Sequence, residues 1–299
     1  MTDPLVSAEF FRAYSHSYAT EANRRRIAFG VDLAFAVAAL VLTVLTGAEW
    51  SPDTVELLTT WLPLAALLWL VLREIGILSV DQRHRRNAVN IQEQLDLYNW
   101  RGNDWPEHWN RLLAGEPVPA RTIKQFASAN PDAELPADYW IDTTGVPDTD
   151  AALFRLEQTA AWGAEGHRRY ALLNRFPALL GLVLVVVAAL ILDASARATA
   201  AAVIAIAPFL VGRIQSSREH AALAARRVSL EQHIQAVLDP ERPSTDVDVR
   251  TAQDELYRLR METRRIPSWL YNHYAERDRA SIDGAIAARI EAFRAAMKP

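Results

Sequence analysis

The sequence predicts an all-α integral membrane protein whose four transmembrane helices form two hairpins in parallel repeat, with helical cytoplasmic regions beside them. The apolar residues gather in two blocks, near 27–80 and 176–212, and arginines flank both blocks. In addition, no alternating pattern of useful length marks a β-strand. A pair of helical hairpins buried in a soluble bundle is the open alternative, although core helices rarely run this long without a polar face.

Each block holds two runs that are candidates for crossing a bilayer, which takes about 20 apolar residues. In the first block, Ile27–Gly47 is a 21-residue run with one charge, and Leu57–Leu72 has 16 uncharged residues. In the second block the runs are shorter, with 17 uncharged residues in Phe176–Leu192 and 15 in Ala198–Gly212. The short link between these two runs predicts a hairpin whose end charges reach the membrane interface.

The placement of arginine predicts how the spans are oriented. Arginines precede the first and third spans and follow the second and fourth, whereas the loop 48–56 has none. Because basic residues concentrate on the cytoplasmic side, both termini are expected in the cytoplasm, and Arg197 is the one exception to the pattern. The expected divisions are an N-terminal segment 1–26, a first hairpin 27–80, a cytoplasmic helical region 81–175, a second hairpin 176–212 and a cytoplasmic helical tail 213–299.

The two halves of the chain share one layout: a basic run, a two-span hairpin and a long polar helix. The polar segments 84–96 and 226–239 both begin near an arginine pair and end on Leu-Asp after glutamine-rich turns. An even number of spans with both ends on one side makes this a parallel repeat, unlike the inverted repeats of many transporters. Duplication and independent patterning of two unrelated helices both account for it.

The regions outside the spans are predicted to be helical. Prolines divide 101–175 into short pieces, except that 151–170 forms a clean helical pattern that leads toward the third span. In the tail, prolines mark a linker near 240–243, and a helix follows it and ends at Pro267. That helix places Arg250, Gln253, Tyr257 and Arg260 on one polar and aromatic face.

Composition excludes several classes of function. The chain has no cysteine, so disulfides and thiol chemistry are absent. A net charge of −4 does not suggest a DNA- or RNA-binding protein. The sequence has no glycine-rich phosphate loop, no Gly-x-Ser-x-Gly elbow and no His-Glu-x-x-His pair, and its seven histidines are scattered. We therefore expect neither an enzyme nor a resident metal or cofactor.

Four polar or helix-breaking residues in the spans are candidates for a pore or gate: Asp32, Arg73, Glu74 and Pro208. Charged side chains in a membrane usually face a bundle interior or a water-filled path, and a proline frees backbone groups that can line a lumen. The alternatives stay open. Asp32 can instead reach the interface near Arg25, the Arg-Glu pair can anchor a helix end, and the proline can simply pack against a neighbour.

Four short motifs follow one another along the chain. They are Ile91-Gln92-Glu93-x-Leu95-Asp96 followed by Trp105; Asp138-Tyr139-Trp140; Gln158…Glu165…Arg169; and Arg250-x-x-Gln253-Asp254-x-Leu256-Tyr257-x-x-Arg260…Pro267-x-Trp269-x-Tyr271. In this order, and with the two hairpins, the pattern resembles the SMODS-associating four-transmembrane effector family over residues 20–285.

The resemblance implies an effector of bacterial cyclic-oligonucleotide antiphage signalling at the inner membrane. It also implies that a partner nucleotidyltransferase makes the activating cyclic oligonucleotide and that the effector forms a pore that kills the infected cell. Four spans make a poor pore alone, so we expect a homo-oligomer. A non-conducting membrane sensor or scaffold, and a small channel or transporter, are the alternative functions.

Cytoplasmic arginines and aromatic residues suit an anionic, stackable nucleotide, through bidentate phosphate contacts and base stacking. The arginines beside the spans have a second explanation as positive-inside anchors. The candidates for ligand binding or oligomer contact are Arg250, Gln253, Tyr257, Arg260, Trp269, Tyr271, Gln92, Asp96, Gln158, Glu165 and Arg169.

Overall fold

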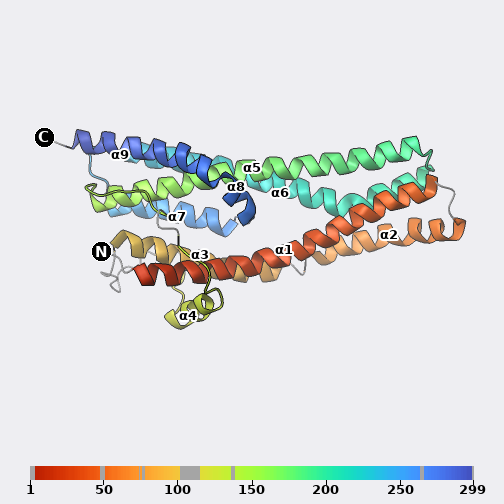
Figure 1. Cartoon of the computed structure of the whole chain (residues 1–299), viewed down its shortest axis with the longest axis horizontal. Helices are drawn as coiled ribbons and strands as arrows, with labels where there is room; N and C mark the ends of the chain where they lie inside the picture. The colour runs from red at the N-terminus through yellow and green to blue at the C-terminus, as the bar shows by residue number, and fades with distance from the viewer. Residues whose placement is uncertain are drawn as a thin grey trace. The chain divides into compact units, whose positions relative to one another are not determined.

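A computed structural model of the chain describes residues 4–47, 51–73, 75, 78–101, 115–135, 139–262 and 266–297. Within these ranges the elements are helices, and one isolated bridge between Asp239 and Arg242 is the only β-type pairing. The helices, labelled in Figure 1, are α1 Pro4–Gly47, α2 Pro52–Leu72, α3 Leu78–Arg101, α4 Ala120–Ser128, α5 Asp148–Ile191, α6 Ala196–Val237, α7 Asp246–Glu262, α8 Ser268–Asp278, the π-helix η3 Arg279–Asp283 and α9 Gly284–Ala296. The all-α prediction is confirmed.

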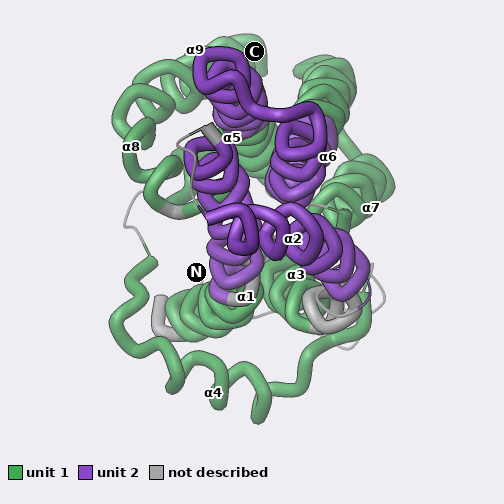
Figure 2. Tube along the Cα trace, turned by 90° about the vertical axis from the view of Figure 1, so that its right-hand side faces the viewer, with its two compact units in different colours: residues 1–21, 83–168, 220–299 green, residues 22–82, 169–219 purple. Residues whose placement is uncertain are grey.

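The chain divides into two compact units, coloured separately in Figure 2. Unit 1 comprises residues 1–21, 83–168 and 220–299, and unit 2 comprises residues 22–82 and 169–219. Unit 2 holds the apolar runs, and unit 1 holds most of the described motif residues, whereas Arg169 belongs to unit 2.

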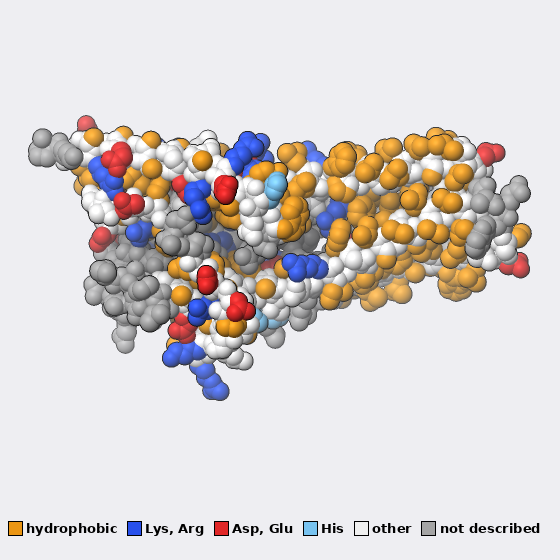
Figure 3. Space-filling model, viewed as in Figure 1, with side chains coloured by type: hydrophobic (Ala, Val, Ile, Leu, Met, Phe, Trp, Pro, Cys, Tyr) orange, Lys and Arg blue, Asp and Glu red, His pale blue; other side chains and the backbone are white. Residues whose placement is uncertain are grey.

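Unit 2 has the surface of a membrane domain. Four helices, α1, α2, α5 and α6, are long and apolar enough to cross a bilayer. Their large side chains point outward: Leu68 is 59% exposed, Val183 53% and Ile191 76%. The hydrophobic side chains over these helices are visible in Figure 3. Soluble monomers rarely expose an apolar surface of this extent.

The interior of unit 2 is built from small residues. Ala39, Ala202 and Ala205 are fully buried and pack with Val185 and Phe209 in one cluster. Small residues let helix backbones approach closely, which is how membrane helices associate when lipid removes the hydrophobic driving force. The apolar outer surface and the small-residue interior of these helices both agree with the predicted membrane spans.

The expected divisions at 26/27, 175/176 and 212/213 all fall inside continuous helices, α1, α5 and α6. The helical pattern of 151–170 does lead into the third span, because α5 runs unbroken to Ile191. α2 ends at Leu72, the last residue of the uncharged run, and the expected first hairpin 27–80 reaches into α3, which begins at Leu78. The helices outlast the apolar runs because arginine, glutamate and alanine are as helix-favouring as leucine.

The two halves of the chain keep a common layout with one difference. Each half begins with a 44-residue helix, α1 or α5, whose carboxyl-terminal part is apolar. In the second half the next span and its polar extension form the single helix α6, whereas in the first half they are the separate helices α2 and α3.

Among the described residues of unit 1, three buried hydrophobic clusters hold the helices in place. One joins α5, α6 and α7 through residues such as Leu153, Leu230 and Leu256. A second joins α1, α3 and α4, and a third packs α9 against α5 through Phe293 and Phe154. These contacts fix the helices that surround the cavity described next.

Candidate ligand-binding site

Unit 1 contains a half-open cavity of about 450 Å³, within the size range of small-molecule sites. Its lining comes from α1, α3, α5, α6, α7, α8, η3 and residues 139 and 140 before α5. The lining residues are Phe11, Tyr14, Tyr18, Gln92, Tyr139, Trp140, Gln158, Thr159, Trp162, Gly163, His167, Arg227, Arg260, Ile266, Tyr271, Asn272, Ala275, Arg279 and Asp283. Aromatic rings and arginines thus make up about half of the lining of one cavity.

The aromatic residues form an ordered wall. The hydroxyl groups of Tyr14 and Tyr139 lie 3.1 Å apart, and the Tyr18 hydroxyl donates to Gln92 Oε1 at 3.2 Å. Trp162 of α5 and Tyr271 of α8 also line the cavity. Their rings stack with centroids 5.5 Å apart and planes 21° from parallel. These rings offer flat, rigid surfaces of the kind on which bases stack.

Arg227 of α6 is the most unusual group in the cavity. It is 6% exposed, and in the described part of the chain it forms no ion pair. Its one hydrogen bond runs from Nη1 to the Thr159 carbonyl at 3.4 Å, and its Nε has no acceptor. Burial, and then the positive charge of Arg260, lower the pKa of Arg227 to about 10, so it remains a cation at neutral pH.

A glycine makes room for this arginine. A Cβ atom placed on Gly163 of α5 would lie 2.3 Å from Nη1 of Arg227 and 2.9 Å from its Cδ. Real Cβ atoms do not approach other atoms so closely. Any larger residue at position 163 would therefore displace the guanidinium group.

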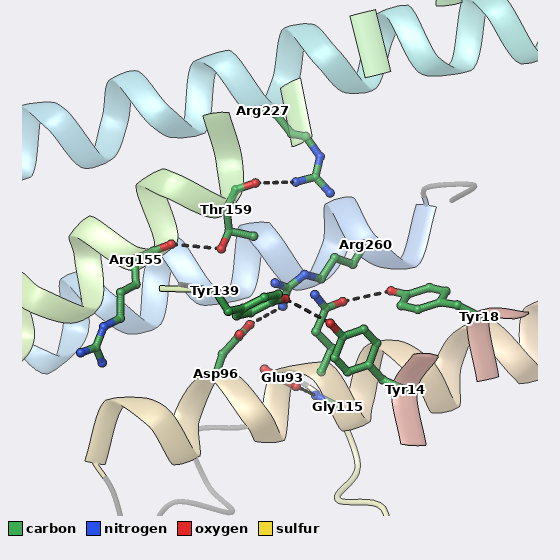
Figure 4. A network of polar contacts seen from close by, with 11 residues as sticks. Tyr14, Tyr18, Glu93, Asp96, Gly115, Tyr139, Arg155, Thr159, Arg227 and Arg260 are labelled. Atoms are coloured by element: carbon green, nitrogen blue, oxygen red, sulfur yellow. Dashed lines mark hydrogen bonds and ion pairs between the residues drawn. The ribbon is translucent and has the colours of Figure 1, made fainter. Parts of the chain in front are cut away.

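Arg260 of α7 lies in the same cavity but is paired. Its Nη1 donates to Asp96 Oδ2 at 2.5 Å, and both side chains are buried. Burial disfavours the Arg260 cation, but the adjacent carboxylate more than offsets this and raises the pKa of Arg260. Its Nη2 has no acceptor. Figure 4 shows Arg227 and Arg260 extending from α6 and α7 toward the space bordered by Tyr14, Tyr18 and Tyr139.

Two buried histidines stand beside Arg227. His167 Nδ1 lies 2.7 Å from His220 Nδ1, and the rings stack with centroids 4.9 Å apart. One ring nitrogen must donate and the other accept, so the pair shares one proton at this contact. Burial first, and then Arg227 and His220, lower the pKa of His167 well below its ordinary value.

Four of the predicted site residues line the cavity: Gln92, Gln158, Arg260 and Tyr271. Asp96 joins them through its pair with Arg260, although it lines a smaller neighbouring hollow together with Gln253.

The other predicted site residues lie elsewhere. Arg250 pairs with Asp254 on its own helix, the Tyr257 hydroxyl donates to Asn90 at 2.9 Å, and Glu165 pairs with Arg168. Trp269 is 58% exposed, and neither it nor Arg169 lines the cavity. The shared face of α7 is largely a packing surface, since Gln253 and Arg260 are both buried.

Sequence reasoning missed Arg227 and Trp162 as site residues. Arg227 follows the fourth span, where the positive-inside pattern already accounts for an arginine. The sequence does hold one relevant signal, which is that Arg226 and Arg227 are adjacent. Successive side chains of a helix point about 100° apart, so these two arginines face different surroundings. Arg226 takes the carboxylates, pairing with Glu255 at 3.0 Å and with Glu262.

The candidate gate residues form a network inside unit 2. Asp32 is 2% exposed; its Oδ1 accepts from Trp69 Nε1 at 2.8 Å and its Oδ2 from Arg73 Nη1 at 3.0 Å. The same Arg73 nitrogen donates to the Pro208 carbonyl at 3.2 Å. Of the two positions predicted for Asp32, the structure shows the bundle interior. Glu74 lies outside the described residues.

No group of three or more histidine, aspartate or glutamate side chains in the described ranges is arranged to hold a metal ion. The cavity's own groups are cations, rings and amides, with Asp283 as its single lining carboxylate. Such a lining suits an organic anion rather than a metal.

These features define a multi-pass membrane protein with an aromatic, cationic cavity in the unit outside its apolar runs. The model of the SMODS-associating 4TM effector domain matches residues 6–288, nearly the whole chain. The chain belongs to that family, whose description associates it with SMODS cyclic-oligonucleotide signalling. Comparison with the curated proteins and with the solved structures gave no match.

Proposed function

We propose that the chain is an antiphage effector of the bacterial inner membrane that binds a cyclic oligonucleotide in the cavity of unit 1. Binding drives oligomerisation and permeabilises the membrane, and the infected cell dies. A partner nucleotidyltransferase supplies the ligand from the cytoplasm, so both termini and unit 1 lie on that side. The family's link to SMODS signalling supports the ligand class.

The observation that carries this proposal is the unpaired, buried Arg227. A buried charge is destabilising unless it is paired and hydrogen-bonded. The fold supplies no anion to Arg227 from the described residues, while it holds the guanidinium group against Gly163 and facing the cavity. A phosphate group from a ligand is the missing partner, because guanidinium binds phosphate through two parallel hydrogen bonds.

The remainder of the lining matches a nucleotide. The rings of Tyr18, Tyr139 and Trp162 provide stacking surfaces, and Arg260 keeps one free nitrogen for a second phosphate. A cyclic oligonucleotide repeats phosphate and base, so it can occupy cationic and aromatic surfaces together.

The proposed pore involves unit 2. The network of Asp32, Arg73 and Pro208 joins α1, α2 and α6, so it restrains these helices relative to one another. Opening a water-filled path between spans requires such a contact to be exchanged for water. We therefore assign these residues to the closed state of the effector.

Binding is tested by titration calorimetry on the full chain in detergent, with a panel of cyclic di- and trinucleotides as probes. Arg227→Met should weaken binding at least tenfold, because it removes a charge-assisted contact. Arg226→Met is the matched control, since it deletes an adjacent arginine that lies outside the cavity. Equal affinity of the two variants for every probe would contradict the assignment of the site.

Permeabilisation is tested in cells that express the chain with a cyclic-oligonucleotide synthase. An impermeant dye should enter before lysis, and the Arg227→Met variant should stay dye-free at equal expression. Ligand binding without dye entry would instead favour the non-conducting sensor or scaffold.

A further inference from the structure

One wall of the cavity carries a carboxylate that neutral donors hold in place. Asp283 Oδ1 accepts from Trp162 Nε1 at 2.7 Å and from Gln158 Nε2 at 3.1 Å. The amide of Gln158 cannot turn over, because its Oε1 accepts from the backbone N–H of Ile141 at 3.1 Å. The orientation of the carboxylate is therefore fixed by two side chains of α5.

The second oxygen of Asp283 is free to accept. In the described part of the chain no cation pairs with this carboxylate, and no donor reaches Oδ2. Asp283 is only partly buried and lines the cavity. The stacked rings of Trp162 and Tyr271 stand beside it.

A carboxylate is out of place in a site built only for phosphate. Its negative charge would repel the ligand that Arg227 attracts, so it lowers the affinity for a bare anion. It favours binding only when the ligand also brings N–H donors to it. A base with a donor-rich edge does so, and a buried site of this kind rejects analogues that leave its polar groups unpaired.

We propose that Asp283 selects guanine bases in the cyclic oligonucleotide, while Arg227 and Arg260 take its phosphates. This inference rests on the proposed function. Guanine presents two adjacent donors, N1–H and the N2 amino group, to an acceptor. Adenine and cytosine place a ring-nitrogen lone pair beside their single amino group, and uracil flanks its one N–H with two carbonyl oxygens, so each of these sets a lone pair against the carboxylate.

The first experiment varies the ligand and leaves the protein unchanged. Calorimetry on the full chain in detergent compares cyclic dinucleotides, and matched trinucleotides, whose bases are all guanine, all adenine, all uracil or all hypoxanthine. Hypoxanthine keeps N1–H and O6 but lacks the N2 amino group. We expect guanine probes to bind at least tenfold more tightly than the other three.

The second experiment changes the acceptor. In Asp283→Asn the amide oxygen must still face Trp162 and Gln158, since both donate, so the new NH₂ group faces the cavity. Affinity for guanine probes should fall ten- to a hundredfold, while adenine and uracil probes lose nothing. Glu276→Gln on α8 is the control, because it removes one exposed charge outside the lining. Retained binding of the adenine probes also shows that the variant is folded.

The outcomes separate the two proposals. Tight binding of all four probe sets with equal affinity overturns the role of Asp283 and leaves the proposed function standing. Binding of no probe overturns both. A guanine preference that persists in Asp283→Asn, or a hypoxanthine probe as tight as guanine, also overturns the inference.

Discussion

Arg73 of unit 2 and Arg227 of unit 1 are both buried, and these two arginines have opposite surroundings. In unit 2, Arg73 donates to Asp32 and to the Pro208 carbonyl. In unit 1, Arg227 has a single 3.4 Å bond to the Thr159 carbonyl and no carboxylate partner in the described residues. Both residues are at most 8% exposed. The first charge is thus compensated within its own fold, and the second calls for an anion from outside it.

Residue type and burial therefore do not distinguish a structural charge from a ligand-binding charge. The two are distinguished by whether the fold supplies the charge with an oppositely charged partner. A compensated ion pair tolerates joint replacement by apolar groups, whereas removing one member strands the other. Removing an uncompensated cation has the opposite effect on stability, because it relieves a desolvation penalty. The loss appears only in the affinity for the ligand.

The largest expected effect is at the compensated pair. Asp32→Ala removes the carboxylate that pairs with Arg73 inside unit 2, and breaking a buried pair in this way typically costs about 3–5 kcal/mol. We expect a large drop in the unfolding temperature of the full chain in detergent. The double variant Asp32→Leu with Arg73→Leu should recover most of the loss. A single variant as stable as the parent would show that lipid or water compensates Arg73.

Arg227→Met should have the opposite sign in the absence of ligand. It removes an unpaired buried cation in exchange for an apolar chain of similar length, so the free energy of unfolding should rise by roughly 1–2 kcal/mol. The thermal shift caused by a binding cyclic oligonucleotide should be lost at the same time. Thermal unfolding with and without that nucleotide measures both effects. A destabilised, still responsive variant would mean that Arg227 is structural after all.

Gly163→Ala tests the position of Arg227 and keeps its charge. The added methyl group occupies the space of the guanidinium group, so Arg227 must shift. We expect ligand affinity to fall about tenfold, roughly the worth of one charge-assisted hydrogen bond. Gly30→Ala is the control, since a Cβ atom there meets nothing within 4 Å. Unchanged affinity in Gly163→Ala would separate Arg227 from the ligand.

The architecture was predictable because its signals are local. Apolar runs and arginine flanks lie within 20 or so residues of one another, and they indicate the four spans. Helix continuity through position 26 or 212 was not predicted, since polar helical residues continue the helix without any apolar signal.

The site was only partly predictable because its signals are distant in sequence. The pairing of Trp162 with Asp283 joins residues 121 positions apart, and no pattern along the chain reports it. The helix that carries Arg250, Gln253, Tyr257 and Arg260 is present as α7, but the sequence does not show that α3 contacts this face. Asn90 and Asp96 of α3 accept hydrogen bonds from Tyr257 and Arg260. Of the four residues on that face, only Arg260 lines the cavity.

The smallest expected effect is a pH dependence of stability from His167. Its pKa lies well below 6.5 in the folded chain, because of burial and then the charges of Arg227 and His220. Below about pH 6.5 the unfolded chain binds a proton that the folded chain does not, so stability falls as the pH falls. The slope from this one group is at most about 1.4 kcal/mol per pH unit, and above pH 6.5 the group contributes none.

Thermal unfolding between pH 5 and 8 should therefore show a shallower acid limb in His167→Gln than in the parent. Arg227→Met tests whether the neighbouring cation contributes to this acid limb. Removing the neighbouring cation takes away one of the causes that lower the pKa of His167, which narrows the window in which folded and unfolded chains differ in protonation. Its acid limb should fall between those of the parent and His167→Gln, while Arg226→Met should follow the parent. Identical limbs in all four proteins would mean that His167 does not report the field of the unpaired arginine.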